Sequence, residues 1–210
     1  MKTLITFLSV LCFAISANAQ WKVGPRVSVG VVTQSETNIP IMPQGDYYTY
    51  EFGYVGSPQV SSLGFMAYNN LGPVFLQSEF LATKYTLEFS MTTYKSINAP
   101  ELYRETHYVI EIPFAAGVNY KNFKFGVGPV FEINVDKDSE LAVMENYTDR
   151  SKKSDFGFHG LIGYTKGIFH IDLKYHYKFS SMVEDFAFGY DQFMFNKSAN
   201  RLSIAMGVAF

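Results

Sequence analysis

The stretch FHIDLKYHYKF, residues 169–179, alternates apolar or aromatic side chains with polar ones along its whole length. The odd positions carry Phe, Ile, Leu or Tyr, whereas the even positions carry His, Asp or Lys. A period of two residues is typical of a β-strand whose two faces differ, and it does not fit the 3.6-residue period of a helix. The stretch therefore predicts a strand with one apolar face and one charged face.

The same alternation recurs elsewhere, most clearly in residues 201–210, 21–31 and 123–133. In these segments the apolar face is opposed by a face of Gly, Ser, Ala and charged residues. We expect eight such strands, at about residues 21–33, 59–68, 73–91, 105–120, 123–135, 154–165, 168–180 and 199–210.

Two classes of protein contain strands of this kind, and they differ in the face that points inward. A soluble sandwich buries the apolar face, whereas an outer-membrane barrel turns it toward lipid and fills a narrow lumen with the other face. Here the second face is rich in Gly and charge, and most strands reach the roughly ten residues that a tilted crossing needs. Although 48% of the chain is hydrophobic, its apolar residues are interleaved with polar ones and do not form the several runs of about 20 that membrane helices need. These features favour the barrel.

The links between the expected strands alternate in length. Residues 34–58, 92–104, 136–153 and 181–198 form long links, whereas residues 69–72, 121–122 and 166–167 form short ones. Short periplasmic turns and long outer loops are typical of a transmembrane barrel with both termini in the periplasm. We therefore expect an all-β fold, an eight-stranded antiparallel up-and-down transmembrane β-barrel in the bacterial outer membrane, with long extracellular loops.

The first residues predict export. Lys2, an apolar run from Leu4 to Ile15 and the small-x-small motif ending at Ala19 match a cleaved signal peptide over residues 1–19, which leaves residues 20–210 as the barrel domain. The only cysteine, Cys12, lies inside this segment, and Leu11 before it fits a lipoprotein cleavage site poorly, so lipid attachment is the weaker alternative. Disulfides and thiol catalysis are then excluded from the mature chain.

Three segments also resemble a known family. They are residues 76–81 (LQSEFL), residues 108–113 (YVIEIP) and residues 126–129 (GVGP), and they are similar to the PorT-like outer-membrane β-barrel domain. The resemblance covers nearly the whole mature chain and includes Phe210, which is similar to the C-terminal signal that the barrel-assembly machinery reads. It implies the fold and the location, and it leaves the activity open.

The alternation also predicts which polar residues face the lumen. We expect a network formed by Arg26, Glu79, Glu111, Lys124, Glu132, His170, Asp172, Lys174, His176 and Arg201. Because an eight-stranded barrel is just wide enough for side chains, these charges are expected to pair across it as a polar core, with a conducting pore as the weaker alternative. Glu79, Glu111 and Glu132 are expected to form one belt of carboxylates on three successive strands.

Metal binding and catalysis are the less favoured interpretations of these residues. His170, Asp172 and His176 share one strand face, but neighbours two apart lie about 6.6 Å from each other and would need ligands from another strand. His107 near Glu105, and Asp155 near His159, are the candidate acid/base pairs. We expect no enzyme, no cofactor and no metal.

Aromatic residues of the long links are the candidates for recognition. They are Tyr47, Tyr48, Tyr50, Phe52, Tyr54, Phe186, Phe188 and Tyr190. The alternative is that these segments continue the strands or form an aromatic girdle. Pro40 and Pro43 argue against a regular strand just before the first aromatic group.

Two functional classes remain. The first is a structural or accessory outer-membrane protein that contacts lipid, the barrel-assembly machinery during biogenesis and another outer-membrane or secretion component. The second is a small channel or transporter. A net charge of −2 gives no reason to expect nucleic acid.

Overall fold

The computed structural model describes residues 21–33, 37–41, 50–56, 59–93, 100–143, 147–149, 153–179, 186–188 and 200–210. The expected signal peptide, residues 1–19, lies outside them. The long strands are β1 (Lys22–Val32), β4 (Val60–Leu71), β5 (Val74–Thr93), β6 (Glu101–Tyr120), β7 (Phe123–Ser139), β9 (Ser154–Lys166), β10 (Phe169–Lys178) and β12 (Arg201–Val208). The short elements are β2 (Thr37–Ile41), β3 (Tyr50–Gly56), β8 (Tyr147–Asp149), β11 (Phe186–Phe188) and the 3-10 helix η1 (Glu140–Val143).

The eight long strands close into a ring. They are ordered β5-β4-β1-β12-β10-β9-β7-β6, and β6 pairs again with β5. Each of these pairs is antiparallel, so the chain runs up and down around the ring. Closure leaves no unpaired edge along the crossing part of the sheet, as lipid requires. The all-β, up-and-down fold expected from the sequence is confirmed.

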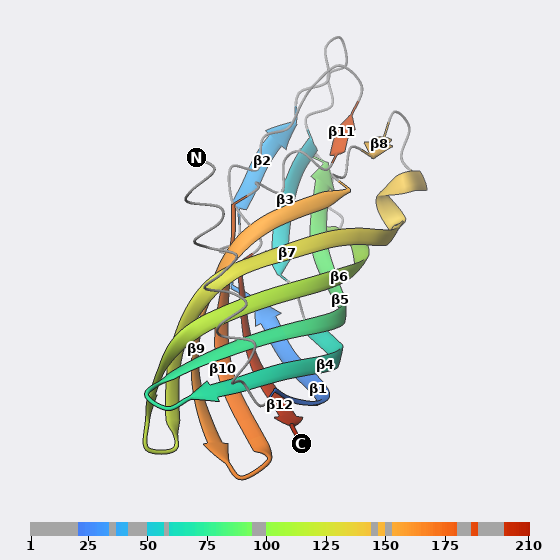
Figure 1. Cartoon of the computed structure of the whole chain (residues 1–210). Helices are drawn as coiled ribbons and strands as arrows, with labels where there is room; N and C mark the ends of the chain where they lie inside the picture. Colours follow the sequence, from blue (N-terminus) through green and yellow to red (C-terminus); the bar gives the residue numbers. More distant parts are fainter. Residues whose placement is uncertain are drawn as a thin grey trace, which may run out of the picture.

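Three tight turns lie at one end of the ring, which we call the turn end (Figure 1). They join β4 to β5, β6 to β7 and β9 to β10, and each contains a residue in the left-handed region: Gly72 (φ 80°), Lys121 (φ 56°) and Gly167 (φ 64°). The last residues of the chain lie at the same end (Figure 1). The short elements β2, β3, β8 and β11 lie at the opposite end, which we call the loop end (Figure 1).

The outer wall is apolar between the two ends. Leu173 and Ile204, which face each other on β10 and β12, are 46% and 48% exposed. Aromatic residues are exposed near the turn end at Trp21, Tyr120, Phe123 and Phe169, and near the loop end at Tyr108, Phe156, Tyr177 and Phe179. These rings lie where the two aromatic girdles of a transmembrane barrel are found, and further rings, among them Phe65, Phe80 and Phe114, are exposed on the wall between them. Among the described residues no helix is both long and apolar enough to cross a membrane.

The loop end differs from the sequence expectation. β5, β6 and β7 reach Thr93, Glu101 and Ser139, which is two residues beyond the expected limit for β5 and four for β6 and β7, because backbone pairing continues after the apolar alternation has ended. The expectation of no regular strand around Pro40 is wrong, since β2 contains it and pairs with β3. β2 is the last strand of the sheet order, and an edge strand tolerates a residue without an N–H donor. Pro43 lies outside the described residues.

Candidate functional site: the charged interior

All ten residues predicted to face the lumen are buried. Their exposed fractions lie between 0 and 8%, while their neighbours in sequence on β10 and β12 are exposed on the outer wall. They are Arg26, Glu79, Glu111, Lys124, Glu132, His170, Asp172, Lys174, His176 and Arg201. Charges buried to this extent are costly unless they are paired and hydrogen-bonded, so their contacts decide what the interior can do.

The first group of charges, the Asp172 cluster, consists of Arg26, Gln77, Glu79, Lys124, Asp172 and Lys174. Asp172 on β10 forms ion pairs with Arg26 on β1 and with Lys124 on β7, where Lys124 Nζ lies 2.9 Å from Oδ1. All three side chains are fully buried. These pairs therefore connect three strands across the lumen.

Gln77 and Glu79 bring β5 into the Asp172 cluster. Glu79 pairs with Lys174 and lies 3.6 Å from Arg26 Nη2. Gln77 donates from Nε2 to Glu79 Oε1 at 2.6 Å and accepts from Lys124 Nζ at 2.7 Å. Gln77 is missing from the predicted set because a neutral amide carries no charge signal, although alternation along β5 places it on the inward face.

A glycine makes the Lys124–Asp172 pair possible. Gly163 on β9 is aligned with Lys124 on one side and with Asp172 on the other. A Cβ atom at Gly163 would overlap Asp172 Oδ1 and the Lys124 side chain. The absent side chain therefore lets Lys124 pass over β9 to reach its carboxylate, which explains why small residues line the inward face beside large charged ones.

The second group, the Arg201 cluster, lies nearer the loop end and consists of Glu111, Glu132, Asp155, His176, Lys178 and Arg201. Glu111 on β6 and Glu132 on β7 are direct cross-strand partners. Arg201 donates from Nη1 to Glu111 Oε1 at 2.6 Å, and its Nη2 contacts Glu132 and lies 2.5 Å from His176 Nδ1. One guanidinium thus bridges two carboxylates and weakens the repulsion between them.

Lys178 completes the Arg201 cluster. Its Nζ lies 2.7 Å from Asp155 and 3.6 Å from Glu132. The partner that the structure gives Asp155 is thus Lys178, whereas the candidate acid/base pair named His159, whose Nδ1 has no hydrogen-bond partner among the described residues.

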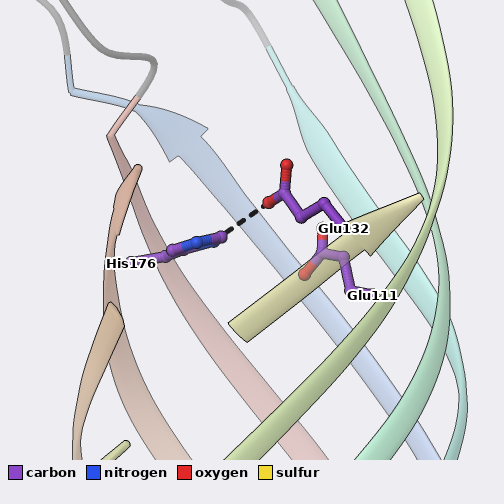
Figure 2. A group of neighbouring side chains, drawn as sticks. All are labelled: Glu111, Glu132 and His176. Atoms are coloured by element: carbon purple, nitrogen blue, oxygen red, sulfur yellow. Dashed lines mark ion pairs between the residues drawn. The ribbon is translucent and has the colours of Figure 1, made fainter. Parts of the chain in front are cut away.

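Glu111, Glu132 and His176 form the only group of potential metal ligands in the described part of the chain (Figure 2). One ligand atom from each lies within 4.8 Å of the others, and His176 Nδ1 is 3.3 Å from Glu132. Arg201 contacts all three, however, so its guanidinium occupies the position that a cation would take. This donor set fits an arginine rather than a metal ion.

The expectation of one belt formed by Glu79, Glu111 and Glu132 is wrong. Glu111 and Glu132 share Arg201, but β5 pairs Leu81 with Glu111, which places Glu79 one inward position nearer the turn end and in the Asp172 cluster. His170, Asp172 and His176 face inward from β10 as expected, yet His176 belongs to the Arg201 cluster, whereas His170 and Asp172 both contact Lys124. The stagger between strands, which the sequence does not reveal, causes both differences.

Glu105 and His107 form a further buried group at the loop end, beyond the aromatic girdle. His107 Nε2 lies 2.7 Å from Glu105 Oε1, as the candidate acid/base pair predicted, and Lys137 Nζ lies 3.1 Å from the same oxygen. Burial raises the pKa of Glu105, but the hydrogen bond from His107 and the charges of His107 and Lys137 outweigh it and hold the pKa below its usual value. Glu105 is thus ionised, and both His107 and Lys137 bind its carboxylate.

Little space separates these groups. A cavity of about 30 Å³ lies between the two clusters, lined by residues that include Glu111, His159 and Lys174. Toward the turn end the packing becomes apolar, with Met66, Tyr68, Phe75, Ala115 and Leu161 buried together. The small cavity holds about two waters at most.

The aromatic residues proposed for recognition are only partly described. Tyr47, Tyr48 and Tyr190 lie outside the described residues. Tyr50 and Phe52 belong to β3, which pairs with β5, and Phe186 and Phe188 belong to β11, which pairs with β8. Tyr54 is 1% exposed and packs edge to face on Phe89 at 6.0 Å, so its ring stabilises the loop end and is not offered to a partner.

Comparisons with known proteins found no related family, and the solved structures that align with the chain are only distantly similar. No family model and no curated protein matches the chain. The translocator domain of the autotransporter NalP from Neisseria meningitidis aligns with a TM-score of 0.35 and 11% identity, over 100% of this chain and 96% of that one. The NanC porin aligns with a TM-score of 0.25 and 11% identity, over 90% and 98%. Scores this low carry no argument, so the class, an outer-membrane-type β-barrel, rests on ring closure and the apolar wall.

Proposed function

We propose that this protein is a non-enzymatic outer-membrane β-barrel with a plugged polar lumen, which serves as a structural or accessory component. The observation that carries the proposal is the Asp172 cluster, whose charged groups come from β1, β5, β7 and β10 and meet in the middle of the ring. An ion crossing the lumen would have to separate these buried pairs, and breaking one costs about 3–5 kcal/mol.

The working surfaces are then the outer wall and the loop end. With the short turns in the periplasm, the extended ends of β5, β6 and β7 stand outside the cell. The PorT-like resemblance of the sequence supports a further part of the proposal, that the partner is another outer-membrane or secretion component.

Conductance in planar bilayers tests the plugged lumen. The full chain is expected to give no stable current above that of a protein-free bilayer. Glu79→Ala leaves Lys174 without its carboxylate and is expected to lower the free energy of unfolding without opening a large conductance. A stable current from the unmutated protein, with an ion selectivity that changes in Glu79→Gln or Arg26→Gln, would refute the plug and identify a channel instead.

The accessory role needs a separate test. The full chain with an affinity tag is purified from the outer membrane in a gentle detergent, and the co-purifying proteins are identified. We expect an outer-membrane or secretion component that is lost when the loop end is shortened, for example by replacing residues 37–56 with a tight turn. Purification of the barrel alone at every detergent strength would contradict the accessory role.

A further inference from the structure

A polar hollow lies at the turn end of the barrel. It has a volume of about 350 Å³ and is lined by residues that include Lys22, Asn119, Lys121, Asn122, Thr165 and His170. These residues come from β1, the turn after β6, and the two sides of the turn after β9. Neither ion-pair cluster contributes a carboxylate to it, so this hollow is a separate site, which we call the turn-end pocket.

Hydrogen bonds between neighbouring turns fix the rim of the turn-end pocket. Asn70 Oδ1 accepts from the Gly72 N–H at 3.1 Å and from Asn119 Nδ2 at 3.0 Å, which ties β6 to the turn after β4. The Asn122 carbonyl accepts from the Thr165 N–H at 2.8 Å, which ties β9 to the turn after β6. The rim is therefore formed in advance and needs little ordering to receive a ligand.

The charge at the turn-end pocket is positive. Lys22 and Lys121 both line it, and none of the lining residues is an Asp or a Glu. Neither lysine has an ion pair among the described residues, and Lys121 Nζ lies 5.6 Å from the centre of the Tyr120 ring. The nearest cluster carboxylate, Asp172, is fully buried and already paired with Arg26 and Lys124. Lys121 also has a left-handed backbone, which is uncommon for a residue that is neither Gly nor Asn.

His170 supplies an independent indication of a ligand. Its Nδ1 lies 3.2 Å from the Thr165 hydroxyl and 3.5 Å from Lys124 Nζ. Because an ammonium group only donates, Nδ1 is the acceptor and the proton of the neutral ring belongs to Nε2. His170 is 1% exposed and its Nε2 has no hydrogen-bond partner among the described residues. A buried N–H donor at the pocket is thus left without an acceptor.

We propose that the turn-end pocket binds a phosphate group, with Lys22 and Lys121 as its charge partners and, once its ring turns toward the pocket, the His170 Nε2–H as a hydrogen-bond donor. Two ammonium groups without a facing carboxylate match a dianion better than a single negative charge. The volume exceeds that of a free phosphate ion, so the group also fits when it is carried on a lipid headgroup. The proposal is independent of the plugged lumen, since the pocket lies outside both clusters.

Nuclear magnetic resonance of the full chain with ¹⁵N-labelled histidine tests this site, because only four histidines contribute signals. Titration with inorganic phosphate in detergent is expected to move the His170 Nε2 resonance in a saturable way and to leave His107, His159 and His176 unchanged. Lys22→Gln and Lys121→Gln are each expected to weaken the effect about tenfold. Lys166→Gln, an exposed lysine at the same end that does not line the pocket, is the matched control and should bind as the unmutated chain does.

Two further arms separate the sources of the phosphate group. The barrel is placed in nanodiscs of phosphatidylcholine with or without phosphatidic acid, and a shift that requires phosphatidic acid and is not produced by inorganic phosphate assigns the site to a headgroup. Sulfate and acetate are titrated in detergent as competing anions. Equal shifts with acetate, or no His170 shift with either phosphate source in a folded barrel, would overturn the proposal.

Discussion

Glu111 and Glu132 lie directly opposite each other on β6 and β7, and both carboxylates are bound by the guanidinium of Arg201 from the far side of the barrel. Like charges in direct cross-strand positions destabilise a sheet, and more so when they are buried. Lys178 on β10 lies 3.6 Å from Glu132, but only Arg201 binds both carboxylates. The stability of the pair is thus linked to the first residue of β12, the last strand of the ring.

Arg201→Gln should be strongly destabilising. The variant leaves Glu111 and Glu132 facing each other without their shared donor, so we expect a loss of about 3–5 kcal/mol in the free energy of unfolding, measured by denaturant titration in lipid vesicles. The double variant Arg201→Gln, Glu132→Gln removes the repulsion and should recover part of the loss. Additive effects in the two single variants and the double variant would show that Arg201 does not act through Glu132.

Gly163→Ala and Gly160→Ala form a matched pair on β9. The new methyl group at Gly163 overlaps Asp172 and Lys124, whereas at Gly160, on the outward face, it meets nothing within 4 Å. We expect a loss of about 1–3 kcal/mol for Gly163→Ala from overpacking and almost none for Gly160→Ala. If both substitutions changed the free energy of unfolding equally, the Lys124 side chain would not pass over β9 at Gly163.

The strands and their faces could be predicted from the sequence because both depend on an alternation that is local. Each residue of β10 from Phe169 to Lys178 faces the side that its parity predicts. The partners of the inward charges could not be predicted in the same way. Arg201 meets Glu111, 90 residues away, only because of the stagger of the closed ring, and the single belt expected for Glu79 failed for this reason.

The loop end shows a second limit of the sequence pattern. Strand pairing there is carried by backbone hydrogen bonds in water, where alternation of apolar and polar side chains is no longer required. Glu101, Arg104 and Asp138 therefore interrupt the pattern but not the strands. His170 likewise faces inward as predicted. Its other nitrogen, Nδ1, contacts Thr165 across the β9–β10 turn and Lys124 on β7, and only the arrangement of the ring brings Lys124 there.

Leu173→Arg or Ile204→Arg should lower stability by about 2–4 kcal/mol, since each places a charge on the lipid-facing wall near the middle of the membrane. The measurement is the fraction of folded barrel that shows a heat-dependent shift on gels, together with unfolding in vesicles. Ser203→Ala, on the opposite face of β12, is the control and should have a mild effect. Equal tolerance of all three substitutions would mean that the faces are reversed.

Single-cysteine variants test which end of the barrel is extracellular. Ala142 in η1 at the loop end and Lys166 beside the β9–β10 turn are both exposed. If the turns are periplasmic, a maleimide coupled to a polymer too large to cross the outer membrane should label Ala142→Cys on intact cells and leave Lys166→Cys unlabelled. Both should react after lysis. Labelling of Lys166→Cys alone on intact cells would invert the orientation.

Glu105 makes the stability of the loop end depend on pH. Its pKa is lower in the folded protein than in the unfolded chain, so ionised Glu105 contributes stability above the ordinary pKa of about 4.3, and this contribution disappears as the pH falls through the lower, folded value. Glu105→Gln lacks this titration. We therefore expect the difference in the free energy of unfolding between the unmutated protein and Glu105→Gln to shrink as the pH is lowered from about 6 to about 3. Glu88→Gln, which removes an ion pair to the exposed Arg104, should change stability by at most about 1 kcal/mol at either pH. A difference for Glu105→Gln that stays constant over this range would mean that Glu105 is not held ionised by His107 and Lys137.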